Sequence, residues 1–218
     1  MKNRLNFLIT ISLFLLLVAA LCAQAQPNKI YHLKLLAVQE LPDGKYLGSP
    51  ADLYLEIREG TGRVFIDTFP LTKLDTQVST RFAKEIACKH YDLNCDKYDF
   101  IYTIKAQSSI IGGPSAGAAT SALTAVALLG LNYDENIAIT GTINSGATIG
   151  PVGGLKEKLD AAKESKATIV ILPKGTAQQK LNAETVFRNL TAINLTTKKD
   201  TLTLKDYGTK TLGLKISE

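Results

Sequence analysis

Apolar residues recur along the chain with two kinds of spacing, one typical of strands and one typical of helices. Short apolar or alternating runs are bounded by turn residues, and they predict strands at residues 32–38, 100–105, 137–140 and 168–172. Two further runs, 51–58 and 63–67, are joined by Glu-Gly-Thr-Gly, which predicts a β-hairpin.

Three other segments have the spacing of helices. Apolar residues at four-residue steps predict a helix over residues 75–90, with Asp75 as its N-cap. Small and apolar residues predict a second helix over 115–129, ended by Gly130, and an amphipathic third over 155–165. Strands and helices alternate in the second half of the chain, which predicts parallel pairing there. The expected fold class is a single α+β domain with mixed sheets packed by helices.

The N-terminus has the features of an export signal. Lys2 and Arg4 precede an apolar run at residues 7–23, and the small residues of Ala-Gln-Ala at 23–25 are typical of a cleavage site. The run is also just long enough for an uncleaved membrane anchor. With either outcome the following domain is expected outside the cytoplasm, because the positive charges stay inside.

We therefore expect three parts. Residues 1–25 form a signal peptide or membrane anchor, residues 26–198 form the domain, and residues 199–218 form a polar, loosely held tail. Asn189 and Asn194 each begin a glycosylation sequon, a tripeptide that is also common by chance.

The charge distribution and the cysteine content bear on possible partners, disulfides and metal sites. The net charge is +5, but basic residues are interleaved with acidic ones, so no nucleic-acid partner is expected. In an exported chain Cys88 and Cys95 favour a disulfide, with two free thiols as the alternative. Only His90 lies nearby as a further ligand, so no metal site is predicted, and no cofactor is expected.

The first candidate site is the Gly-Gly-Pro-Ser-Ala-Gly sequence at residues 112–117. Its glycines permit a tight approach, and the proline fixes φ just ahead of the helix. Ser115 then lies at the first helical turn, where unpaired backbone N–H groups suit a developing oxyanion. Serine is also an ordinary N-cap, and the Gly-Lys-Ser/Thr ending of a phosphate-binding loop is missing.

The second candidate is the stretch at residues 150–158, Gly-Pro-Val-Gly-Gly-Leu-Lys-Glu-Lys. A serine nucleophile needs a base, and neither His32 nor His90 lies in a glycine-rich or buried context. A lysine serves if apolar surroundings lower the pKa of its amine. Lys156 follows the apolar stripe of the helix and is the candidate, whereas Lys158 lies about 200° further round and is expected to be solvated.

These segments occur together with Thr-Gly at residues 140–141. In wording and order they resemble the proteolytic domain of the Lon protease family, over roughly residues 33–195 and most strongly over 112–162. Lys156 lies 41 positions after Ser115, a separation that suits such a domain.

The resemblance implies a serine endopeptidase with a Ser–Lys dyad that acts on polypeptides. Ser115 would be the nucleophile and Lys156 the base, oriented by the hydroxyl of Thr140. Backbone at Gly113 and Ala116 would contribute to the oxyanion hole. The resemblance also implies assembly of subunits into a ring.

The chain departs from the Lon pattern in three places. It has no ATP-binding loop, so we expect cleavage that does not depend on ATP. Thr142 stands where many Lon proteins have an acidic residue, and residues 110–113 lack the usual basic and acidic pair. These differences leave the substrate preference open. A non-catalytic envelope module that keeps the fold, and a protease that processes only itself or a partner chain, are the alternatives.

Overall fold

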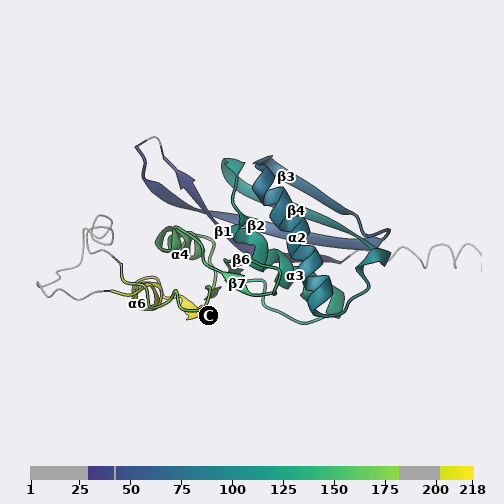
Figure 1. The fold of residues 1–218 in the computed structure, drawn as a ribbon. Helices are drawn as coiled ribbons and strands as arrows, with labels where there is room; N and C mark the ends of the chain where they lie inside the picture. Colours follow the sequence, from purple (N-terminus) through teal and green to yellow (C-terminus); the bar gives the residue numbers. More distant parts are fainter. Residues whose placement is uncertain (1–28, 42, 182–201) are drawn as a thin grey trace, which may run out of the picture.

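The computed structural model describes residues 29–41, 43–181 and 202–218 (Figure 1). The predicted N-terminal signal or anchor and the sequons at Asn189 and Asn194 lie outside the described residues. Within the described ranges, no helix is long and apolar enough to cross a membrane.

A mixed seven-stranded sheet forms the centre of the domain, in the order β3-β4-β2-β1-β5-β8-β9. β1 pairs antiparallel with β2 and β2 antiparallel with β4, whereas the β3/β4, β1/β5, β5/β8 and β8/β9 pairs are parallel. The parallel pairing predicted for the second half is therefore present. The strands are β1 (Ile30–Glu40), β2 (Tyr46–Glu59), β3 (Val64–Thr72), β4 (Tyr98–Ile111), β5 (Ile137–Ile139), β8 (Ile169–Ile171) and β9 (Lys215–Ser217).

The predicted hairpin between residues 51–58 and 63–67 is wrong, because β4 lies between β2 and β3. Phe100, Tyr102 and Ile104 of β4 are completely buried, so this strand belongs in the middle of the sheet. The β2–β3 connection passes the start of β4, where the Asp99 carboxylate accepts the backbone N–H groups of Thr61 and Arg63, each at 2.9 Å.

Two helices, α2 (Leu74–His90) and α3 (Gly117–Leu129), pack together against the sheet (Figure 1). They cover a core that includes Leu53, Leu55 and Leu123. α3 ends at Gly130, which has φ of 64°, as the sequence predicts. The N-cap of α2 is Lys73, and Asp75 lies inside the first turn. The prediction of Asp75 as an N-cap is therefore wrong, and its carboxylate has another partner, described below.

The last residues of the chain are part of the domain, so the prediction of a loosely held tail over 199–218 is wrong for residues 202–218. A short helix α6 (Leu204–Asp206) and a π-helical turn η3 (Tyr207–Thr211) lead into β9, which pairs with β8. Leu204, Tyr207 and Leu214 are buried in a second core that they share with α4 (Leu155–Glu164). Most polar residues of this segment face outward. Because they dominate its composition, the sequence gives little indication that other positions of the segment are buried.

Cys88 at the end of α2 and Cys95 in the 3₁₀ turn η1 (Cys95–Lys97) form a disulfide, as favoured by the sequence. Both cysteines are buried in the first core, with their Cα atoms 6.1 Å apart. The bond therefore fixes the C-terminal end of α2 to the start of β4.

Candidate active site

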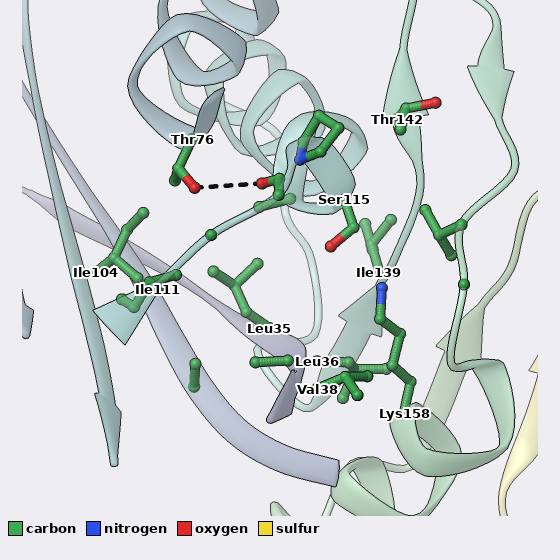
Figure 2. Close-up of a pocket in the computed structure, with 18 of the residues that line it drawn as sticks. Leu35, Leu36, Val38, Thr76, Ile104, Ile111, Ser115, Ile139, Thr142 and Lys158 are labelled. Atoms are coloured by element: carbon green, nitrogen blue, oxygen red, sulfur yellow. Dashed lines mark hydrogen bonds between the residues drawn. The ribbon is translucent and has the colours of Figure 1, made fainter. Parts of the chain in front are cut away.

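A cavity of about 360 Å³ opens between α4, the end of β4 and the C-terminal half of β1 (Figure 2). Its walls are mostly apolar. Ser115 and Lys158 both line it, and Figure 2 shows the serine hydroxyl and the lysine amine directed into the same space. Apolar lining residues include Leu35, Val38, Ile104, Ile111, Ile139 and Val152.

Ser115 lies in the 3₁₀ turn η2 (Pro114–Ala116), which leads directly into α3. The preceding Gly113 has φ of 96°, a region that favours glycine, and both of its backbone polar groups are held by α2. The Gly113 N–H donates to the Asp75 carboxylate at 3.0 Å, and the Gly113 carbonyl accepts the Thr76 hydroxyl at 3.3 Å (Figure 2). The carbonyl of Ser115 accepts the N–H of Gly141 at 3.0 Å. The segment of residues 112–116, which we call the serine loop, is thus fixed from two sides.

Lys158 is buried, with 3% of its surface exposed, so the expectation that it is solvated is wrong. Its amine donates a hydrogen bond to the hydroxyl of Thr140 at 3.0 Å. Burial lowers the pKa of this amine to about 8. An amine with that pKa is partly neutral near physiological pH and can accept a proton.

Lys156 is also buried but lies on another flank of α4, and it does not line the cavity. Its amine donates to the Asp160 carboxylate at 2.7 Å and lies 5.2 Å from the centre of the Tyr207 ring. The structure therefore does not bring Lys156 and Ser115 together. The predicted pairing of Ser115 with Lys156 is therefore not formed here, because the Lys156 amine is bonded to Asp160 on another flank of the helix.

The sequence contains a signal that distinguishes the two lysines. Residues four apart on a helix are neighbours, and the residue four positions after Lys156 is Asp160. The residue at the same distance after Lys158 is Ala162, so that amine has no carboxylate one turn ahead. The spacing of apolar residues on the helix does not show that both lysines are buried. The flank with Lys156 is covered by residues near the C-terminus, Tyr207 among them, far away in the sequence.

Comparison with known proteins agrees with this geometry. The family model for the Lon protease (S16) C-terminal proteolytic domain matches residues 91–204, just over half of the chain. The chain belongs to this family. The match includes β4, the serine loop, Thr140 and α4, and Lon proteases form a family of serine peptidases.

Several Lon proteases are similar to part of the chain. The Lon protease of Clostridium beijerinckii is 38% identical over 92 residues, which are 41% of this chain and 11% of that protein. Lon protease 1 of Thermus thermophilus is 38% identical over 82 residues (38% and 10%), and Lon protease 2 of Bacillus subtilis is 41% identical over 63 residues (29% and 11%). The matched region is thus about a tenth of each relative.

The other residues expected from the Lon resemblance fall near the cavity. Thr140 holds a lysine as expected, but the lysine is Lys158. Ala116 and Thr142 line the cavity. Gly113 also lines it, but its N–H is bonded to Asp75 and is therefore not free to stabilise an oxyanion in this structure. Sequence reasoning missed this role of Asp75, because an acidic residue at a helix start has the ordinary explanation of a cap.

Proposed function

We propose that this Lon-family chain is a serine endopeptidase in which Ser115 is the nucleophile and Lys158 is the general base. The main support is that Lys158 shares an apolar cavity with Ser115 and has a hydroxyl as its hydrogen-bond partner. Among the described residues that line this cavity, Lys158 is the only one with an ionisable side chain. The neutral amine that the base requires is therefore favoured by its surroundings.

In the first half of the reaction the Ser115 hydroxyl oxygen bonds to the carbonyl carbon of a peptide, and the hydroxyl proton passes to the Lys158 amine. The tetrahedral intermediate then loses its C–N bond, and the leaving amine takes that proton from Lys158. An ester between Ser115 and the N-terminal part of the substrate remains.

In the second half a water molecule attacks the ester carbon and gives a proton to Lys158. The C–O bond to Ser115 breaks, and the proton returns to the serine oxygen. The acid product leaves and the enzyme is restored. Thr140 keeps the amine directed into the cavity throughout, since its hydroxyl oxygen holds one of the amine hydrogens.

The oxyanion is assigned to backbone donors at the start of the helical segment. Ser115 and Ala116 lie in η2, directly before α3, and this end of a helix carries outward N–H groups and a partial positive charge. Such donors stabilise negative charge on the carbonyl oxygen. Gly113 would join them only if its N–H left the Asp75 carboxylate.

The substrate class follows from the cavity walls. Leu35, Val38, Ile104, Ile111 and Ile139 offer an apolar surface beside the nucleophile. A polypeptide with an apolar side chain next to the cleaved bond fits this surface, because burial of apolar groups is favourable and no charge faces them except Lys158.

The proposal also includes the setting predicted from the sequence. The Cys88–Cys95 disulfide supports an oxidising compartment, and the apolar residues 7–23 behind two basic residues support export, with cleavage or membrane anchoring as the two outcomes. We also propose that cleavage does not depend on ATP and that the subunits assemble into a ring. Rates with and without ATP, and light scattering of the purified chain, test these two points.

The decisive experiment measures cleavage of an unstructured fluorogenic peptide by the purified chain. Ser115→Ala and Lys158→Met are expected to lose about 10³-fold or more of the rate. Lys163→Met is the matched control, since Lys163 lies on the same helix but is exposed. An inactive wild-type chain that is folded would favour the non-catalytic module. Cleavage of its own chain alone, seen by mass spectrometry, would favour the self-processing alternative.

A further inference from the structure

The C-terminal segment contacts α4 through one polar group of three side chains, which we call the Tyr207 cluster. The Tyr207 hydroxyl donates to one oxygen of the Asp160 carboxylate at 2.5 Å, and the Lys156 amine donates to the other at 2.7 Å. The amine also faces the Tyr207 ring. Burial and the Asp160 carboxylate raise the pKa of Tyr207, so this hydroxyl keeps its proton and remains a donor.

The cluster lies on the helix that carries Lys158, opposite the hydrogen bond from Lys158 to Thr140. α4 has ten residues, and Gly154 before it offers no side-chain cap. Its apolar contacts with the C-terminal segment, through Leu159 and Ala162, are close but non-directional. Hydrogen bonds have directional preferences, so the bond from Tyr207 of the C-terminal segment to Asp160 restricts rotation of the helix about its axis. Within the helix, the bond from Lys156 holds the Asp160 carboxylate in place to accept it.

Rotation of α4 matters because of where Lys158 lies. Lys156 and Lys158 are about 200° apart around the helix, so a turn that moves one moves the other in the opposite direction. The Lys158 side chain extends into the cavity, where its amine is bonded to the hydroxyl of Thr140. The Tyr207–Asp160 bond on the far flank is thus suited to keep this amine within reach of Thr140 and of the cavity.

We propose that Tyr207 is a positioning residue that acts through Asp160 and Lys156 to hold α4 in the orientation that directs the Lys158 amine toward Ser115. The inference depends on the proposed role of Lys158 as base. It gives the C-terminal segment a function in catalysis although none of its residues lines the cavity.

If the Tyr207 cluster is lost, we expect the amine of Lys158 to become more accessible to water. Burial is what lowers the pKa of this amine, so access of water raises it. Among the described residues that line the cavity, Lys158 is the only ionisable one, and on its own helix the half-buried Glu157 is adjacent. The Asp75 carboxylate does not line the cavity and is bonded to the N–H of Gly113, which does.

The experiment compares Tyr207→Phe with Tyr133→Phe in the full chain. Tyr133 is a matched control, because its hydroxyl also has a partner, the backbone N–H of His32, but lies away from α4. We expect Tyr207→Phe to lower kcat about tenfold with little change in KM, less than the ~100-fold that a 1 Å misplacement can cost. Tyr133→Phe should leave both constants unchanged.

A second readout does not need substrate. Trace acetylation of lysines over a pH series, analysed by mass spectrometry, reports the pKa of the Lys158 amine. In the wild type it should be about 8, and in Tyr207→Phe it should rise by roughly one pH unit. Lys156→Arg, which keeps the charge and the carboxylate partner, should restore most of the activity lost in Lys156→Met. Lys210→Met removes an exposed Lys–Asp pair of the same spacing and should change nothing.

The outcomes separate the two claims. If Lys158 keeps its wild-type labelling profile in Tyr207→Phe, the positioning role is wrong, whatever the peptidase activity. If the profile shifts but the wild-type chain cleaves no peptide, the positioning role stands and the proposed function fails. Should Tyr207→Phe not fold, Asp160→Ala replaces it, since this variant removes the acceptor of the Tyr207 bond from the other side. An unchanged labelling profile in that variant also overturns the inference.

Discussion

The amine of Lys158 and the hydroxyl of Thr140 form a hydrogen bond of 3.0 Å inside a cavity whose other walls are mostly apolar. The bond holds the amine without a negative charge. A carboxylate in the place of Thr140 would favour the protonated amine of Lys158. The amine of Lys156, in contrast, is bonded to the Asp160 carboxylate. The hydrogen-bond partner of each lysine, a hydroxyl for Lys158 and a carboxylate for Lys156, is therefore the difference on which the proposal of Lys158 as base rests.

Replacing Thr140 by valine removes this acceptor while preserving most of the side-chain volume. The amine should lose its direction, and we expect kcat to fall about 10- to 100-fold, within the range of general-base contributions. Thr140→Ser keeps a hydroxyl and should recover most of the rate. The measurement is steady-state cleavage of an unstructured peptide. Equal rates for the valine and serine variants would show that the hydroxyl has no orienting role.

The rate should depend on pH through the Lys158 amine. Only the neutral amine accepts the serine proton, and its pKa is about 8. We therefore expect kcat/KM to rise about tenfold per pH unit below this value and to level off above it. A profile from pH 6 to 10 measures this. A rate that is flat across this range would be incompatible with lysine as the base.

Burial of Lys158 should cost stability. The folded chain binds a proton on this amine less well than the unfolded chain does, because the folded pKa lies below the ordinary value of 10.5. The penalty is complete below pH 8 and disappears as the pH rises toward 10.5.

Lys158→Met removes that penalty while filling similar space. We expect its free energy of unfolding at pH 7 to increase by about 1 to 3 kcal/mol, with no gain at pH 10.5. Denaturant unfolding at the two pH values measures the difference, and Lys163→Met is the exposed control. A variant that is less stable at pH 7 than the wild type would contradict the account of a desolvated amine.

The β1–β2 pair fixes the position of α4 at close range. A Cβ added at Gly48 of β2 would overlap the backbone carbonyl of Glu157, next to Lys158. Gly48→Ala should therefore push α4 away, destabilise the chain by about 1–3 kcal/mol and lower kcat. Gly146→Ala is the control, because its added Cβ would meet no atom closer than 3.5 Å. Thermal melts and peptide cleavage measure both effects; a Gly48→Ala chain with wild-type rates would exclude this coupling.

The fold could be predicted from the sequence where the signal is local. Apolar alternation correctly marks β1 and β4, and Gly130 correctly marks the end of α3. The order of strands could not be predicted, because the insertion of β4 between β2 and β3 depends on which strand buries most of its side chains. The glycines around residues 59–62 are equally compatible with a hairpin and with the connection that forms.

The candidate site was predictable in part. The Gly-Pro-Ser segment and the lysine-bearing helix do meet at one cavity, and Thr140 does hold a lysine. The choice between Lys156 and Lys158 failed because it assumed that only one flank of α4 is buried. The polar composition of the last twenty residues hides Leu204, Tyr207 and Leu214, which cover the other flank. Burial of both lysines is thus a tertiary effect.

The central claim is that Lys158 activates Ser115, and covalent modification of Ser115 by a fluorophosphonate tests it most directly. The rate of modification, followed by mass spectrometry of the serine-containing peptide, should rise with pH through about 8 in the wild type and in Lys163→Met. In Lys158→Met it should fall at least 100-fold and lose this pH dependence. Modification of Ser115 at the wild-type rate in folded Lys158→Met would contradict the account.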